Sequence, residues 1–153
     1  MRVSLLSILL LVMFCISCNS NHPPSVFEEK IINRNSAFNL VILFDKDDCM
    51  VCLNEVKSFN KLSKLNKNNL TVKGIVNSGD STLIESFVKK KNINFQVIGN
   101  PELFQKYTSG KTPEHFLVHS KNYEIIYKSK KKKIGSSQEA TFEIINLIIR
   151  NQM

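Results

Sequence analysis

Two cysteines separated by two residues, Cys49 and Cys52, directly follow a short apolar run and constrain the fold more than any other feature of the chain. The run, 39–44, has the length and character of a strand that is covered on both faces. After the cysteines, apolar residues recur at three-residue steps from Val56 to Leu65, which predicts a helix with one buried face. The sequence therefore predicts a buried strand, a short acidic loop, and a helix whose first turn carries both sulfurs.

The first turn of a helix favours a thiolate, because unpaired backbone N–H groups and the positive end of the macrodipole meet there. A thiolate is the nucleophile of thiol–disulfide exchange. Cys49, nearer the helix start, is the predicted nucleophile, and Cys52 is predicted to resolve the mixed disulfide. A structural zinc site and an inert disulfide are the two other interpretations of the pair. Zinc needs four ligands, and the histidines that could add to the pair are His22, His115 and His119.

A second motif, Thr112-Pro113, stands just before another apolar run at 115–119. With the cysteine pair, it makes the chain resemble the thioredoxin superfamily. The similarity is strongest to the membrane-tethered, TlpA/ResA-like branch of thiol–disulfide oxidoreductases, in which a Glu commonly stands where Glu55 does. The resemblance covers roughly 38–149. It implies an α/β, thioredoxin-like fold with a central mixed β-sheet flanked by helices, and a redox-active disulfide at the cysteine pair.

The resemblance also assigns roles to individual residues. Thr112 and Pro113 match the family's cis-proline loop, which binds an extended segment of the substrate through the backbone of the residue before the proline. One residue departs from the pattern: Leu43 replaces the buried acid that thioredoxin carries in this strand. Proton transfer to and from Cys52 therefore needs another group, either Glu55 or water.

Two carboxylates, Asp47 and Asp48, directly precede Cys49. By charge alone they oppose a thiolate, destabilise the reduced pair, and make it a poorer oxidant. We therefore favour a reductase over an oxidase, although a solvated loop with a weak field is an equally good interpretation of the two acids. For His115, two residues after the proline, a core or surface role is favoured over a role in the site.

The N-terminus predicts export. Residues 1–17 combine Arg2 with a continuous apolar stretch at 5–16 that is shorter than a membrane-spanning helix needs. The end of this stretch resembles a lipoprotein signal peptide, in which a small residue precedes a cysteine that becomes the lipidated N-terminus; here that cysteine is Cys18. Cys15 departs from the usual Leu, so a signal cut elsewhere and an uncleaved anchor are the alternatives. Each of these places the domain outside the cytoplasm. The lipoprotein interpretation predicts a membrane-anchored protein that faces the periplasm, on the outer membrane if the cell has one.

The mature chain is expected to be a single domain. Residues 18–37 are predicted to be a tether and N-terminal extension, and 38–150 the thioredoxin-like domain. The segment 26–37 is compatible with a helix or a strand. Beyond the organising strand and helix, the predicted elements are strands at 70–76, 94–98, 115–118 and 123–127, and helices at 81–91, from 100, and at 136–150. The residues predicted to be buried in the helices at 81–91 and 136–150 are Leu83, Ile84, Phe87 and Val88, and Phe142, Ile145, Ile148 and Ile149.

The charge balance is basic but points to no nucleic acid. Lys and Arg number 21 against 13 acids, a net charge of +8; removing 1–17 takes away only Arg2 and leaves 20 against 13, or +7. A solvated lysine-rich surface explains this best, with contact between 130–133 and anionic lipid headgroups as the alternative. The predicted function is an extracytoplasmic thiol–disulfide oxidoreductase, a monomer without cofactor or metal that acts on protein thiols with an unidentified redox partner. The alternative is a metallochaperone or binding module of the same fold.

Overall fold

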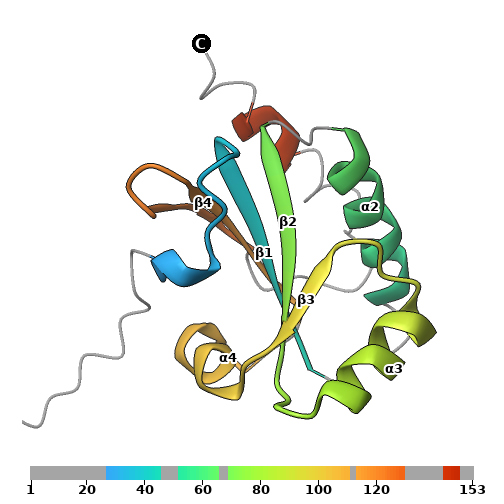
Figure 1. Ribbon diagram of the computed structural model, residues 1–153. Helices are drawn as coiled ribbons and strands as arrows, with labels where there is room; N and C mark the ends of the chain where they lie inside the picture. The colour runs from blue at the N-terminus through green and yellow to red at the C-terminus, as the bar shows by residue number, and fades with distance from the viewer. Residues whose placement is uncertain (1–26, 46–51, 66–68, 111–112, 130–142, 149–153) are drawn as a thin grey trace, which may run out of the picture.

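The computed structural model describes residues 27–45, 52–65, 69–110, 113–129 and 143–148. Within these ranges the chain alternates strands and helices around one sheet (Figure 1). The elements, in chain order, are η1 (Glu29–Ile31), β1 (Phe38–Phe44), α2 (Cys52–Leu65), β2 (Leu70–Val76), α3 (Ser81–Lys91), β3 (Gln96–Gly99), α4 (Pro101–Tyr107), β4 (Glu114–His119) and β5 (Ile125–Lys128).

The five strands form a mixed sheet in the order β3-β2-β1-β4-β5. The first three strands run parallel, joined through α2 and α3, because parallel neighbours require a crossover connection. The last two are antiparallel to their neighbours, as a hairpin gives. The predicted α/β fold with a central mixed sheet flanked by helices is confirmed.

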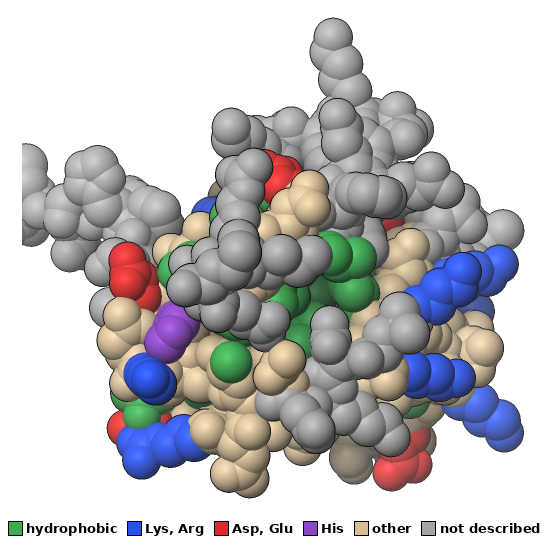
Figure 2. Space-filling model, turned by 90° about the horizontal axis from the view of Figure 1, so that it is seen from above, with side chains coloured by type: hydrophobic (Ala, Val, Ile, Leu, Met, Phe, Trp, Pro, Cys, Tyr) green, Lys and Arg blue, Asp and Glu red, His purple; other side chains and the backbone are tan. Residues whose placement is uncertain are grey.

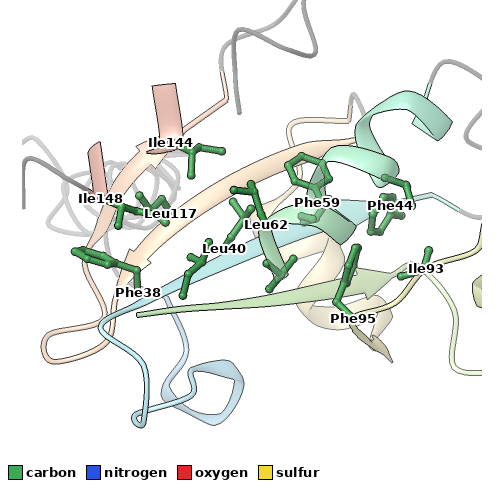
Figure 3. Packing of buried hydrophobic residues seen from close by; sticks show 14 of the residues in the cluster. Phe38, Leu40, Phe44, Phe59, Leu62, Ile93, Phe95, Leu117, Ile144 and Ile148 are labelled. Atoms are coloured by element: carbon green, nitrogen blue, oxygen red, sulfur yellow. The ribbon is translucent and has the colours of Figure 1, made fainter. Parts of the chain in front are cut away.

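Strand β1 is buried along its whole length, because both faces of the sheet are covered. Its alternate residues enter two separate clusters. Phe38, Leu40, Ile42 and Phe44 pack against α2, whose Phe59 and Leu62 lie over the strand in Figure 3. Val41 and Leu43 face α4 and the N-terminal segment on the other side, which Figure 1 shows across the sheet from α2 and α3.

Side-chain caps define where two helices begin. Asp80 accepts hydrogen bonds from the N–H groups of Thr82 (2.9 Å) and Leu83 (3.2 Å), so it caps α3. Asn100 caps α4 in the same way, with Pro101 at the first helical position. Asn92 ends α3 in the left-handed conformation (φ 51°), which Asn tolerates better than most residues.

The predicted buried face of α3 is wrong at Leu83, whose surface is 51% exposed. Leu83 lies in the first turn, and from that turn it is Ile84 that packs against the end of β3, close to Gly99. One turn on, Phe87 is buried and Val88 is half-buried against the core, as predicted. The helix thus covers the sheet with a narrower stripe than its apolar pattern indicates.

The segment before β1 forms neither a long helix nor a strand of the sheet. It makes the short 3-10 turn Glu29–Ile31 and nevertheless buries Phe27, Ile31 and Ile32. Phe27 stacks on Tyr107 of α4 (centroids 4.0 Å apart), and its N–H donates to the Tyr123 carbonyl (2.7 Å). Burial of these three apolar side chains stabilises the second face of the sheet, by about 1.5–3 kcal/mol for each.

The C-terminal part departs from prediction by small shifts. In the helical segment 143–148, Ile148 is buried as predicted, but its partner one turn back is Ile144 rather than Ile145, which is half-buried. The predicted inward residues Phe142 and Ile149 lie outside the described residues. Strand β5 starts at Ile125 rather than at 123, because Tyr123 adopts a positive φ (59°) and an irregularity follows in the ladder with β4.

The lysines and arginines of the described residues are spread over the surface and do not gather on a single face. Seen from above in Figure 2, they gather in separate groups, one along the right-hand edge, the side of α2 and α3 in Figure 1. Nowhere in the described ranges is a helix both long and apolar enough to cross a membrane.

Candidate functional site

The predicted site residues belong to segments that start from one edge of the sheet. In the β1–β4 ladder, Leu43 pairs with Glu114, the first residue of β4. The chain leaves β1 at Phe44 and returns as α2 at Cys52, and it enters β4 from Pro113, which is partly exposed. Cys49 and Thr112 lie outside the described residues, as does Cys18. Chain connectivity therefore brings the segments after β1 and before β4 to the same edge.

A buried acid–imidazole pair lies just behind this edge. Glu55, in the first turn of α2, faces His115 of β4, with 3.3 Å between Glu55 Oε2 and His115 Nε2. The two side chains are 15% and 3% exposed. His115 pairs in register with Ile42 of β1, so α2 crosses over the strand and places the carboxylate against the ring. The imidazole also packs edge-on against Phe59, one turn further along α2 (centroids 4.7 Å apart).

The polar atoms of this pair are not satisfied by ordinary hydrogen bonds. Among the described residues, neither nitrogen of His115 nor Oε2 of Glu55 has a partner of good geometry. The close approach of Oε2 and Nε2 is thus electrostatic contact without a well-aligned bond. Buried polar atoms are nearly always paired, and a buried orphan costs about 1–3 kcal/mol. Such a cost points to a role other than stability.

Tyr127 of β5 belongs to the same neighbourhood. The pKa of its phenol is raised to about 12, mainly by burial. The negative charge of Glu143, a hydrogen bond with the Glu143 side chain, and the charge of Glu55 raise this pKa further. A phenol held neutral beside carboxylates is a hydrogen-bond donor over the whole physiological range. This face of the sheet therefore brings the phenol of Tyr127 within electrostatic reach of Glu55, which itself faces the imidazole of His115.

On the opposite face of β4, Glu114 supports the loop that leads to Pro113. Its Oε1 accepts hydrogen bonds from the Thr108 hydroxyl (3.1 Å) and the Ser109 N–H (2.5 Å), and its Oε2 lies 3.3 Å from Lys128 Nζ. The side chain is 5% exposed. Glu114 was not among the predicted site residues; the sequence signal that could have found it is an acid placed between a proline and an apolar run.

The sequence anticipated part of this arrangement. Glu55 was named from the resemblance, whereas His115 was assigned to the core or surface; it is in the core, but it faces Glu55. The zinc alternative that uses both His115 and His119 does not fit, because four residues along a strand separate them by roughly 13 Å. Within the part of the chain that the structure describes, no three potential metal ligands cluster.

Comparison with known proteins identifies the fold. No protein-family model and no curated protein sequence matches the chain. Solved structures do match. A secreted disulfide oxidoreductase of Mycobacterium tuberculosis, homologous to DsbE of E. coli, superposes with a TM-score of 0.59 at 17% identity, covering 78% of this chain and 87% of that one. A thiol-disulfide oxidoreductase from Bacteroides fragilis gives 0.58 and 19%, covering 80% and 98%.

A thioredoxin-like protein from Parabacteroides distasonis is similar as well, with a TM-score of 0.59 at 15% identity over 85% of this chain and 94% of that one. At such identities the likeness concerns the fold. The chain has a thioredoxin-like fold, and the resemblance drawn from the cysteine pair and Thr112-Pro113 is confirmed at that level.

Proposed function

We propose that this chain is an extracytoplasmic thiol–disulfide oxidoreductase that exchanges disulfides with protein substrates through Cys49 and Cys52. The observation that carries the proposal is that both motifs adjoin the same end of β1. Helix α2, which follows β1 in the chain, begins at Cys52. Pro113 directly precedes Glu114, the first residue of β4, which pairs with Leu43 near the end of β1. A helix start favours a thiolate, and solved structures of the same fold include a disulfide oxidoreductase and a thiol-disulfide oxidoreductase.

In the proposed reduction, the Cys49 thiolate attacks a substrate disulfide. A bond forms between Cys49 and one substrate sulfur, and the other substrate sulfur leaves as a thiolate and takes up a proton. Cys52 then loses its proton and attacks Cys49, which closes the Cys49–Cys52 disulfide and releases the second substrate thiolate. Two electrons pass from the protein to the substrate, so a redox partner must reduce the pair again.

The substrate segment would lie along Thr112 and Pro113. A cis bond at Pro113 would let the backbone of Thr112 pair with an extended substrate strand, with Glu114 holding the preceding loop through Thr108 and Ser109.

Lipidation of Cys18 after removal of 1–17 would tether the domain to the membrane through 18–37. Asp47 and Asp48 favour a reductase. Carboxylates near Cys49 destabilise its thiolate and therefore the reduced form of the pair, which makes the disulfide form a poorer oxidant of substrates.

The test replaces one sulfur at a time. Cys49→Ser is expected to reduce the rate of insulin-type disulfide reduction by at least about a hundredfold, since the nucleophile is lost. Cys52→Ser should instead accumulate mixed disulfides that mass spectrometry detects. Full activity of Cys49→Ser would exclude this mechanism, and stoichiometric copper or zinc on the reduced protein would favour a metal-binding module.

The direction of exchange follows from the reduction potential of the pair. A value near about −270 mV, measured by counting thiols in graded redox buffers, would support a reductase. A value near about −120 mV would identify an oxidant and show that the two aspartates do not control the site.

A further inference from the structure

Among the described residues, Glu55 and His115 are two ionisable side chains that face one another and that both carry buried atoms without well-formed hydrogen bonds. Glu55 Oε2 and both ring nitrogens of His115 are buried without a partner of good geometry among the described residues, although Oε2 and Nε2 lie 3.3 Å apart. These buried atoms therefore keep hydrogen-bonding capacity that the described residues do not use.

The position of the pair connects it to the cysteines. Glu55 follows Cys52 by three residues in α2, and residues at this spacing are neighbours on a helix surface, with about 5–6 Å between their Cβ atoms. Leu43, at the place of the buried acid that thioredoxin carries, is fully buried among apolar residues of the opposite face and can exchange no proton. A carboxylate one turn after Cys52, with an imidazole behind it, can.

We propose that His115 is a positioning residue for proton transfer at the redox site: through Glu55, it takes up the proton that Cys52 releases when Cys52 resolves a mixed disulfide. This inference rests on the proposed exchange function. Its new element is His115 of β4. With His115, the proton acceptor consists of two groups, the Glu55 carboxylate and the imidazole, on the side of α2 that faces the sheet.

The step balances as follows. The Cys52 S–H bond breaks, and its proton passes to the Glu55 carboxylate and on to His115 Nε2, which becomes part of an imidazolium beside a carboxylate. The Cys52 sulfur attacks the Cys49 sulfur of the mixed disulfide, their S–S bond forms, and the substrate sulfur leaves with the electron pair. Cys52 is oxidised and the substrate sulfur is reduced. When the pair is reduced again, the proton returns along the same path.

The surroundings allow this proton to be held. On this side of the sheet, Glu143 from the 143–148 segment and Glu55 from α2 both act on Tyr127 of β5. Glu114 and Lys128 pair across the other face, where Lys128 also lies over the Phe116 ring. An imidazolium at His115 would thus face the Glu55 carboxylate, 3.3 Å away.

Two-phase kinetics with an aromatic disulfide reagent such as DTNB separates the two cysteines. In a protein with Cys15 and Cys18 changed to serine, the first chromophore release reports attack by Cys49, and the second reports resolution by Cys52. His115→Phe should slow the second release by about 10- to 100-fold near neutral pH, the low end of general acid–base effects or somewhat below it. The deficit should shrink at alkaline pH, where solvent removes the proton, and the first release should change by less than about twofold.

A matched control exists on the same strand. His119 is half-buried, packs edge-on against Phe38 at the far end of β4 (centroids 5.5 Å apart), and touches no part of the proposed path. His119→Phe makes the same chemical change and should leave both releases and their pH profiles unaltered. If His115→Phe and His119→Phe behave alike at every pH, His115 has no part in resolution and the inference is overturned.

A measurement on the unsubstituted ring covers the case in which His115→Phe fails to fold. Nitrogen NMR of the imidazoles at neutral pH should show that the ring-nitrogen signals of His115 differ between the disulfide and dithiol forms, while those of His119 do not. Identical His115 signals in both forms would overturn the inference. A protein that gives no second release and no disulfide at all would instead overturn the proposed function, so the two failures are distinguishable.

Discussion

Two buried polar clusters lie at opposite ends of β1, and they are built in opposite ways. At the start of the strand, the Asn39 amide donates to Ser120 Oγ (2.7 Å) and to the Asn33 carbonyl (3.1 Å), and its oxygen accepts from the Asn33 N–H (2.8 Å). Near its other end, the Glu55–His115 pair beside Ile42 leaves three buried atoms without a well-formed bond.

The difference indicates that the Asn39 cluster stabilises the fold, whereas the Glu55–His115 pair is suited to chemistry. A neutral cluster in which every group is bonded joins three segments, those before β1, in β1 and after β4, and fixes their register. An ionisable cluster with unused hydrogen-bonding capacity adds little to stability, because desolvation offsets the attraction. What such a cluster retains is the ability to change protonation, which is useful only beside reactive chemistry.

The largest expected effect comes from breaking the satisfied cluster. Asn39→Ala removes three hydrogen bonds and leaves Ser120 and Asn33 with unpaired groups, so the free energy of unfolding should fall by about 2–4 kcal/mol. Denaturant unfolding measures this. Asn35→Ala, at an exposed position on the same segment, is the control and should change stability by less than about 0.5 kcal/mol. A loss below about 1 kcal/mol at Asn39 would mean that the cluster does not hold the register.

The unsatisfied cluster should tolerate complete removal far better. The double variant Glu55→Leu with His115→Leu replaces a buried ionisable pair by apolar side chains, and its stability should stay within about 1 kcal/mol of the parent or rise. His115→Leu alone should be less stable than the double variant by about 1–2 kcal/mol, because it leaves the Glu55 carboxylate buried without its partner. A double variant destabilised as strongly as Asn39→Ala would remove the contrast between the two ends.

The sequence predicted the elements of the fold better than their contacts. Strand β1 follows from a continuous apolar run and the buried face of α2 from apolar periodicity, and both depend on the local sequence alone. Leu83 was placed inside because a period cannot reveal how far the underlying sheet extends. Ile144 was missed for the same reason. The stacking of Phe27 on Tyr107 could not be predicted, because it depends on a contact 80 positions away along the chain.

The candidate site shows the same limit. Glu55 could be named because its distance from Cys52 is a local pattern. The role of His115 could not, since its partner is set by the register of β4 on β1 and by the crossing of α2 over both strands. The burial of Glu114 could not be predicted, because an acid at the start of a strand is ordinarily solvent-exposed. Here Thr108, Ser109 and Lys128 contact its carboxylate.

The smallest expected effect tests whether the environment at the Glu55 end disfavours further negative charge. The pKa of Tyr127 is raised from its ordinary value of 10.0 to about 12, first by burial and then by Glu143 and Glu55. Since the folded pKa lies above the unfolded one, the neutral phenol stabilises the fold fully below pH 10, and this stabilisation is lost as the pH rises from 10 toward 12. Because Tyr127 is only half-buried, solvent screening reduces the effect to about 1 kcal/mol.

Tyr127→Phe removes the titrating group and should therefore remove this alkaline loss of stability, apart from what other residues contribute in both proteins. Phenolate absorbance checks the pKa, and denaturant unfolding at several pH values between 9 and 12 checks the stability. In Glu55→Gln the Tyr127 phenol should ionise at slightly lower pH, since one of the nearby carboxylate charges is gone. An unchanged phenol titration in Glu55→Gln would mean that the charge of Glu55 does not act on Tyr127, and that the phenol and the Glu55–His115 pair are electrostatically separate.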